Sequence, residues 1–203
     1  MTMIAIIDYG AGNIKSLQSA LSRLDIPSLL TTSKNEIEKA DAIILPGVGA
    51  FAEAMKQLEK LGLVSLLKSE ASKNKPFLGI CLGMQMLYET SDEGGECPGL
   101  GLFKGKVRLI PDIVKVPHMG WNDLQIKQNV PLLNGIREGS HVYFVHAYFA
   151  AEGDTENLVA DTAYGVRIPA VVQQGNVFGI QFHPEKSGSI GLQILKNFGE
   201  LIS

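Results

Sequence analysis

The stretch of the chain that most constrains its fold is residues 76–87, Pro-Phe-Leu-Gly-Ile-Cys-Leu-Gly-Met-Gln-Met-Leu. Its apolar start predicts a short buried strand through Ile80, then a sharp turn and a helix beginning at Cys81. Gly79 and Gly83 stand two residues to either side of the cysteine, as in a nucleophile elbow with cysteine in place of serine. A thiol at a helix N-terminus has its thiolate stabilised by free N–H groups and the helix dipole. The competing interpretation is a structural cysteine packed as a small hydrophobe.

Two further apolar strands, residues 3–7 and 41–45, each run into a glycine-containing turn and then a helix. Apolar residues at helical spacing indicate these two helices: Ile14, Leu17, Leu21 and Leu24 after the first strand, and Phe51, Ala54, Met55 and Leu58 after the second. This alternation implies parallel strands joined by right-handed crossovers.

The second half of the chain has a different pattern. After a polar, turn-rich loop at residues 90–99, strands follow one another without a convincing helix between them. They are predicted at residues 102–110, 122–127, 142–149, 158–164, 170–174 and 177–182. A last helix has Ile190, Ile194, Phe198 and Leu201 on one face. We expect one α/β domain over residues 1–203, with a central, largely parallel sheet, flanking helices and an antiparallel β extension in the second half.

Composition argues against several classes of function. A net charge of −3 with scattered Lys and Arg gives no surface for nucleic acid, and neither a signal peptide nor a membrane-spanning run is present. Two cysteines, Cys81 and Cys97, make no disulfide framework and indicate a reducing, cytoplasmic setting. Gly10 and Gly12 lack the third glycine of a dinucleotide loop, and no His or Cys pair has zinc spacing. We therefore expect neither a cofactor nor a metal.

A general base and its orienting acid are predicted near the far end of the chain, in the sequence His-Pro-Glu at residues 183–185. If these residues stay extended, His183 and Glu185 lie on the same face, within reach of one hydrogen bond. The alternative is a surface histidine beside an ordinary solvated carboxylate. Together with Cys81, the pair indicates a Cys–His–Glu site for thiol acyl transfer.

The loop at residues 46–49, Pro-Gly-Val-Gly, is a second part of such a site. Acyl transfer needs N–H donors aimed at the carbonyl oxygen that becomes negative. The N–H of Leu82, directly after the nucleophile, would be one donor, and a backbone N–H at Val48 the other. An ordinary strand-to-helix turn is the alternative reading of this loop.

Three motifs together resemble the triad-type, or class I, glutamine amidotransferases: residues 79–85, 46–49 and 183–185. They occur in the family's order and extend over essentially the whole chain. The resemblance implies the three-layer fold of that family and hydrolysis of L-glutamine to glutamate and ammonia through a cysteinyl thioester. Four further segments resemble the glutaminase subunit of imidazole glycerol phosphate synthase: residues 8–13, 116–122, 143–146 and 186–188.

The resemblance also implies roles for individual residues. Cys81 would be the nucleophile, His183 the general base and acid, and Glu185 its orienting carboxylate. The backbone N–H groups of Leu82 and Val48 would form the oxyanion hole. The residues implied to hold glutamine are Gly47, Gly49, Gln85, Glu93, Ala147, Tyr148 and Phe149. Ala147 and Phe149 replace more polar residues expected at these positions, which does not matter if only their backbone groups bind.

The acceptor chemistry would lie on a partner, because a chain of 203 residues has no room for a fused synthase domain. The resemblance implies a (β/α)₈ cyclase, in a 1:1 heterodimer, that uses the ammonia in histidine biosynthesis. This partner would make imidazole glycerol phosphate and an aminoimidazole carboxamide ribonucleotide. The residues implied at the interface are Asn13, Trp121, Tyr143 and Lys186. Trp121 fits a core or hinge position equally well.

Three other functions stay open at this point. The chain could feed a different synthase, such as the pyridoxal phosphate type, against which the segment at residues 119–122 speaks. It could be a non-catalytic module of the same fold, or a thiol peptidase. We also expect the loop around Val48 to act as a switch, since its flanking glycines permit a peptide to flip and withdraw one oxyanion donor.

Overall fold

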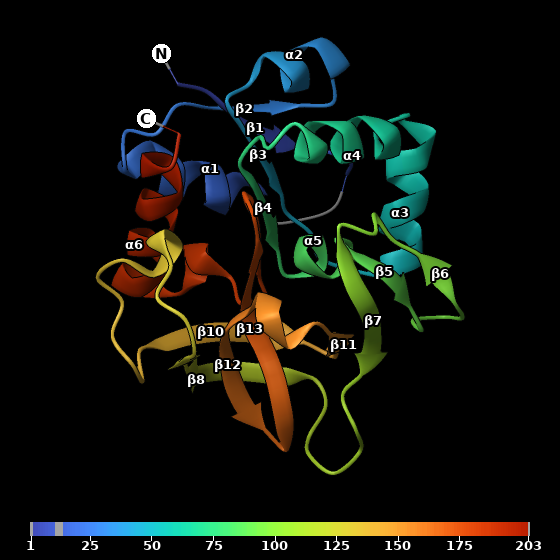
Figure 1. Ribbon diagram of the computed structural model, residues 1–203, viewed down its shortest axis with the longest axis vertical. Helices are drawn as coiled ribbons and strands as arrows, with labels where there is room; N and C mark the ends of the chain where they lie inside the picture. Colours follow the sequence, from blue (N-terminus) through green and yellow to red (C-terminus); the bar gives the residue numbers. More distant parts are fainter. Residues whose placement is uncertain (1, 11–13, 203) are drawn as a thin grey trace.

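The computed structural model describes residues 2–10 and 14–202 of the chain. In these residues eight strands form a central sheet in the order β2-β1-β3-β4-β14-β13-β12-β9 (Figure 1). The first five strands in this order are parallel, and each of the last three runs antiparallel to its neighbour. Their bounds are Ile4–Ile7 (β1), Ser28–Thr31 (β2), Ala42–Leu45 (β3), Phe77–Ile80 (β4), Gln125–Ile126 (β9), Leu158–Tyr164 (β12), Val166–Gln174 (β13) and Val177–Ile180 (β14).

Helices cover both faces of this sheet and make the fold three-layered. On β1, Ile4 and Ile6 face the layer of α1 and α6, whereas Ala5 and Ile7 face the layer of α3 and α4 (Figure 1). A strand that is covered on both faces needs a continuous apolar sequence, which β1 has. The helices are Ile14–Arg23 (α1), Lys34–Lys39 (α2), Phe51–Lys60 (α3), Val64–Ser72 (α4), Leu82–Gln85 (α5) and Gly188–Glu200 (α6).

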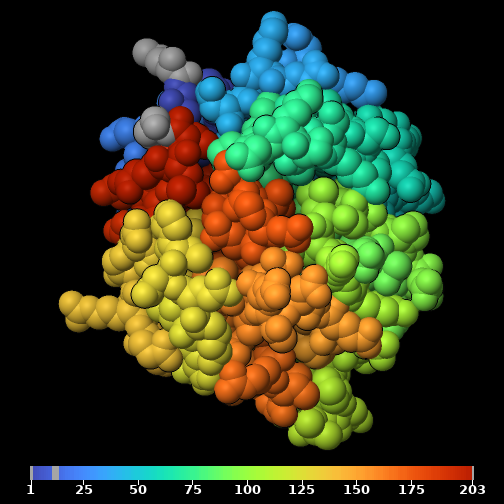
Figure 2. Space-filling view, viewed as in Figure 1, coloured from blue at the N-terminus to red at the C-terminus, as the bar shows by residue number. Residues whose placement is uncertain are grey.

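Two smaller sheets extend the fold below the helical layers. One has the strand order β11-β7-β5-β6 and the other pairs β10 with β8. Figure 2 shows the segments coloured yellow and orange on the lower part of the visible face, below the blue and teal N-terminal helices. The strands are Tyr88–Ser91 (β5), Cys97–Pro98 (β6), Phe103–Leu109 (β7), His118–Asp123 (β8), His141–His146 (β10) and Tyr148–Gly153 (β11). Three short 3₁₀ turns occur among the described residues, at Pro131–Leu133 (η1), Thr155–Asn157 (η2) and Pro184–Lys186 (η3).

The predicted class and the largely parallel sheet are confirmed, but several predicted elements were wrong in detail. The stretch 142–149 is not one strand, because β10 pairs with β8 and β11 with β7, and the chain changes sheets at Ala147. The predicted loop at residues 90–99 contains the end of β5 and all of β6, which pair with each other. β8 begins at His118, four residues before the predicted strand.

The insertion of β14 between β4 and β13 positions the site. Ile80 at the end of β4 pairs in parallel register with Ile180 at the end of β14. The backbone N–H of Cys81 then donates to the Ile180 carbonyl at 2.8 Å. Residues about a hundred positions apart in the chain thus leave the same edge of the sheet side by side, where α/β proteins place their sites.

Candidate active site

Cys81 sits on a strained turn between β4 and α5. Its φ is +54° and its ψ is −111°, a backbone conformation that residues other than glycine rarely adopt. Cys81 as a whole is 5% exposed. A Cβ at Gly83 would overlap the carbonyl oxygen of Leu45, and one at Gly79 would lie 2.7 Å from the carbonyl oxygen of Gly83. Glycine at position 83 therefore lets the elbow approach β3, and glycine at position 79 lets α5 pack closely against β4.

The helix after the elbow is shorter than the sequence predicts. It begins at Leu82, one residue later than expected, and spans only four residues, with Cys81 as its N-cap. A single turn sums few peptide dipoles. The contribution expected from a helix dipole therefore reduces to the N–H groups of this turn.

His183 and Glu185 are hydrogen-bonded, with Nδ1 of the histidine 2.9 Å from Oε1 of the carboxylate. The expected extended conformation was wrong, because residues 184–186 form the 3₁₀ turn η3 and only His183 is extended. The His183 backbone N–H donates to the Tyr143 carbonyl at 3.0 Å, and its carbonyl accepts from Ser187 Oγ at 2.6 Å. These bonds fix the backbone that carries the imidazole.

The protonated form of His183 is favoured in the folded chain. Burial by itself lowers the pKa of this imidazole, but hydrogen bonds and charge interactions with Cys81 and Glu185 outweigh burial and raise the pKa to about 9. Nδ1 of His183 is hydrogen-bonded to Glu185. Nε2 is buried without a nitrogen or oxygen partner among the described residues. Nε2 is therefore the atom available to exchange a proton with the Cys81 sulfur.

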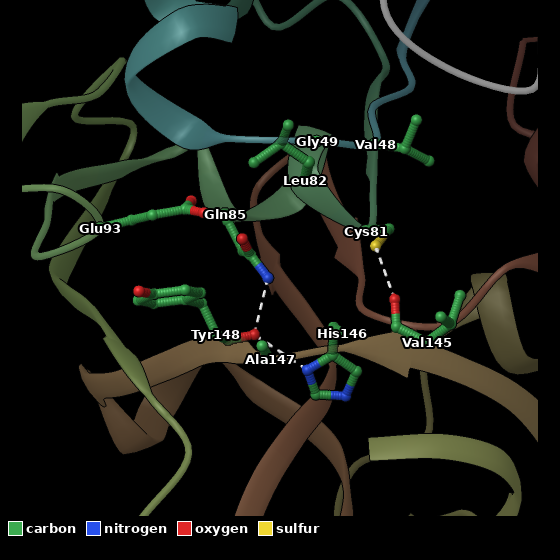
Figure 3. Close-up of a pocket in the computed structure, with 10 residues that line it drawn as sticks. All are labelled: Val48, Gly49, Cys81, Leu82, Gln85, Glu93, Val145, His146, Ala147 and Tyr148. Atoms are coloured by element: carbon green, nitrogen blue, oxygen red, sulfur yellow. Dashed lines mark hydrogen bonds between the residues drawn. The ribbon is translucent and has the colours of Figure 1, made fainter. Parts of the chain in front are cut away.

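A cavity of about 150 Å³ opens beside the thiol (Figure 3). Figure 3 shows Gln85 and Glu93 at the end of the cavity away from Cys81, with the Gln85 amide turned toward the Tyr148 carbonyl. Gln85 Nε2 donates to that carbonyl at 2.7 Å, and Glu93 Oε2 accepts the backbone N–H of Phe51 at 2.8 Å. The cavity is lined by Val48, Gly49, Cys81, Leu82, Gln85, Glu93, Val145, His146, Ala147 and Tyr148.

Most of the residues predicted to hold glutamine therefore line one cavity, but two do not. Gly47 lines a smaller space next to His183 and Glu185. The side chain of Phe149 is buried in a separate apolar cluster with Ile110 and Ile168. Sequence reasoning did not single out Val145 and His146 as lining residues.

The loop at residues 46–49 blocks one of the two predicted oxyanion donors. The Leu82 N–H donates to the Gly47 carbonyl at 3.4 Å, so this carbonyl occupies the donor predicted for an oxyanion. The Tyr9 hydroxyl holds the start of the loop by donating to the Pro46 carbonyl at 2.8 Å, and its burial raises the pKa of Tyr9. Gly49 has a φ of +99°, which favours glycine.

A pair of buried histidines lies under the cavity. His146 Nδ1 is 2.9 Å from the Tyr148 carbonyl, so Nδ1 carries the hydrogen and Nε2 must accept. His118 Nδ1 lies 3.1 Å from that Nε2 and is therefore its donor. Burial lowers the pKa of His118 to about 4 and that of His146 to about 3, so both are neutral near pH 7. His146 is thus oriented by a carbonyl and a histidine, in the absence of an acid.

The predicted interface residues lie partly together on the surface. Trp121 is 56% exposed, which excludes the core position considered for it, and its ring centroid lies 6.0 Å from that of Tyr143. Lys186 Nζ lies 6.0 Å from the same tyrosine ring. Met119, two residues before Trp121, is also exposed. Asn13 lies outside the described residues.

The described residues contain no cluster of three or more side chains that could hold a metal ion. In the same part of the chain, no helix is long and apolar enough to cross a membrane.

Comparisons with known proteins identify relatives along the whole chain. The family model for glutamine amidotransferase class-I matches residues 5–201. A protein from Oceanobacillus iheyensis named imidazole glycerol phosphate synthase subunit HisH is 56% identical over 200 residues, covering 98% of this chain and 100% of that protein. Proteins with the same name from Caldanaerobacter subterraneus and Moorella thermoacetica are 52% and 49% identical, over 98% and 100% of this chain and 98% and 96% of their own.

Solved structures share the fold at low identity. A crystal structure of a glutamine amidotransferase has a TM-score of 0.78 at 22% identity, covering 98% of both chains. A structure of PurLQS from Thermotoga maritima has a TM-score of 0.78 at 21% identity, covering 100% of this chain and 99% of that one.

Proposed function

Because this chain belongs to the class-I glutamine amidotransferase family, we propose that it is the glutaminase subunit of imidazole glycerol phosphate synthase. It hydrolyses L-glutamine to glutamate and supplies the ammonia to a cyclase in histidine biosynthesis. The observation that carries the proposal is the contact of Cys81, which lines a small cavity, with His183, whose imidazole is hydrogen-bonded to Glu185. The complex is a lyase that depends on this hydrolase subunit for nitrogen.

The residues around the cavity support a thioester mechanism. The Cys81 sulfur, as a thiolate whose proton is already held by His183 Nε2, attacks the side-chain carbonyl carbon of glutamine. The C–N bond then breaks, and His183 returns the proton to the leaving amine, which departs as ammonia. Water, deprotonated by His183, hydrolyses the thioester and releases glutamate with the free thiol. Glu185 holds the imidazole tautomer throughout.

Glutamine binding falls to the other residues of the cavity. We place its side-chain carbonyl near the N–H groups of Leu82 and Val48 and its α-carboxylate and α-amino groups among Gly49, Gln85 and Glu93. Ala147 and Tyr148 form the opposite wall.

The Gly47 carbonyl supports a regulatory role for the loop at residues 46–49. While this carbonyl accepts the Leu82 N–H, it leaves no free pair of donors for the oxyanion. Loss of one oxyanion donor lowers kcat roughly a hundred- to a thousandfold. Rotation of the peptide between Gly47 and Val48 would remove the carbonyl and turn the Val48 N–H inward. We propose that the cyclase, once it holds its own substrate, favours this rotation.

The partner is a (β/α)₈ cyclase bound as a 1:1 heterodimer. We assign to it the surface cluster of Met119, Trp121, Lys186 and the half-buried Tyr143. Asn13 belongs to the same proposal on the ground of the resemblance alone. The two free cysteines fit a reducing compartment, and we propose the cytoplasm.

One experiment tests the function directly. Glutamate release is measured with the chain alone, with the cyclase, and with the cyclase and its nucleotide substrate, for the wild type and for Cys81→Ala. We expect strong stimulation by the full mixture and none with Cys81→Ala. Stimulation that survives Cys81→Ala would assign the cysteine a packing role, and peptide hydrolysis without a partner would favour a peptidase. Stimulation by a pyridoxal phosphate synthase instead of the cyclase would assign the chain to that synthase and contradict the proposed role in histidine biosynthesis.

A further inference from the structure

A buried amide contacts the sulfur of Cys81 from the end of β14. Gln181 follows the last residue of β14 and is fully buried. Its Nε2 lies 3.7 Å from Cys81 Sγ, within hydrogen-bonding range of a large sulfur acceptor, and its Oε1 lies 3.0 Å from Gln85 Nε2. No step of the proposed mechanism uses Gln181.

The hydrogen bonds themselves determine which end of each amide points where. The Tyr148 carbonyl can only accept, so the Gln85 atom 2.7 Å from it must be the nitrogen. The second hydrogen of that nitrogen is directed to Gln181, whose near atom must then be the oxygen. The nitrogen of Gln181 is left to face the sulfur and can only donate to it.

We propose that Gln181 is a positioning residue that donates an N–H to the Cys81 thiolate and holds it in the rotamer that attacks the substrate. A hydrogen bond to a charged acceptor is stronger than one to a neutral acceptor, so the contact favours the thiolate over the thiol. Gln85 orients the Gln181 amide by donating a hydrogen bond to its oxygen. The proposal rests on Cys81 being the nucleophile.

The Tyr148 carbonyl is the anchor of this arrangement. It accepts from Gln85 on one side and from His146 Nδ1 on the other. The chain of bonds from this carbonyl through Gln85 and Gln181 ends at the sulfur, so a single backbone group fixes the direction of every donor in it.

The test compares variants of the full chain, alone and bound to the cyclase. Gln181→Met keeps the length of the side chain and removes both amide groups, whereas Gln181→Glu keeps its shape and replaces the donor by an acceptor. Gln174→Met is the matched control, because Gln174 lies on β13 and its amide oxygen bonds Asn157, away from the cavity. Thermal unfolding of each variant shows whether it is folded.

The first measurement is the pH dependence of alkylation of Cys81 by iodoacetamide, followed by mass spectrometry with Cys97 as the internal reference. We expect the Cys81 midpoint to rise by about 1 pH unit in Gln181→Met, the size of one hydrogen bond to a charged group, and further in Gln181→Glu. The amide of Gln85 bonds Gln181 and not the sulfur. Gln85→Met should therefore shift the Cys81 midpoint in the same direction but by a smaller amount. Cys97 should keep its profile in every variant.

The second measurement is glutaminase kinetics in the activated complex. We expect kcat to fall about tenfold in Gln181→Met with a smaller change in KM, since the lost contact stabilises the attacking group. An unchanged Cys81 midpoint in folded Gln181→Met and Gln181→Glu, or a change in KM alone, overturns the inference. Because alkylation needs neither glutamine nor partner, it separates a failure of this inference from a failure of the proposed function.

Discussion

The carbonyl oxygen of Gly47 lies 3.4 Å from the backbone nitrogen of Leu82 and accepts its N–H. In the proposed mechanism, this backbone acceptor takes the place of a negatively charged substrate oxygen. The Gly47 carbonyl and the substrate oxygen would compete for one donor, and the loop conformation would decide which of them binds it.

The isolated chain should accordingly be a poor glutaminase. We expect glutamate release to rise a hundred- to a thousandfold when the cyclase with its substrate is added, because one oxyanion donor is restored. Rates at saturating glutamine check this. Crystal structures with and without the cyclase substrate that show the same orientation of the peptide between Gly47 and Val48 would contradict the loop mechanism.

Two substitutions of Cys81 should separate the backbone strain at this position from the chemistry of its thiol. Cys81→Ala and Cys81→Gly both remove the thiol, and neither should release glutamate. Only glycine adopts a φ of +54° and a ψ of −111° without strain. Cys81→Gly should therefore be more stable than Cys81→Ala, by about 1 kcal/mol in free energy of unfolding. Denaturant titration of the two variants makes the comparison, and equal stabilities would show that the turn is not strained.

A side chain at Gly83 should destabilise the fold directly. Its Cβ would overlap the carbonyl of Leu45. That carbonyl belongs to the backbone, so it cannot move aside as the end of a flexible side chain could. We expect Gly83→Ala to lower the free energy of unfolding by about 3 kcal/mol. Gly94→Ala is the control, since Gly94 has a φ of +73° but open space around its Cβ position. Its loss should be about 1 kcal/mol, and a Gly83→Ala loss no larger than that would refute the steric argument.

The histidines under the cavity should make stability fall with acid. The folded pKa values of His118 and His146 are about 4 and about 3, below the value near 6.5 of an unfolded histidine. As the pH drops below 6.5, the unfolded chain takes up protons that the folded chain refuses. Each histidine then removes about 1.4 kcal/mol of stability per pH unit until its folded pKa is reached. His118→Gln should flatten this slope between pH 4 and 6.5 in denaturant titrations, and an unaltered slope would show that His118 titrates normally.

His183 should act in the opposite direction. Its folded pKa of about 9 lies above the unfolded value, so its contribution to stability is complete below pH 6.5 and disappears as the pH rises to 9. Glu185→Gln removes one of the anions that raise this pKa and should narrow the pH range over which stability declines. An NMR titration of the His183 imidazole gives its pKa in the wild type and in Glu185→Gln. The pKa should be lower in the variant.

The sequence predicts those parts of the fold that have a strong local pattern. The continuous apolar runs of β1, β3 and β4 and the helical spacing of α3 were sufficient. β2 and α2 were not predicted. β2 is an edge strand of the sheet with partly exposed residues, and α2 has six residues with only Ile37 buried, so neither has the periodicity of a buried element.

The site divides in the same way. The elbow at Cys81 and the pair of His183 and Glu185 are local motifs and could be placed in advance. Gln181 could not, because its partners lie 96 and 100 residues away along the chain. The signal was present as a glutamine at the end of an apolar strand, where a fully buried amide must find hydrogen-bond partners.

The position of β14 has a consequence for the newly made chain. This strand lies inside the sheet, between β4 and β13, yet it is the last strand to leave the ribosome. A nascent chain that already displays the elbow still lacks its proton carrier and a central strand of its sheet. Nonlocal pairing of this kind closes late. Glutamine hydrolysis by the proposed mechanism therefore requires that residues 177–185 have been synthesised and that β14 has paired with β4.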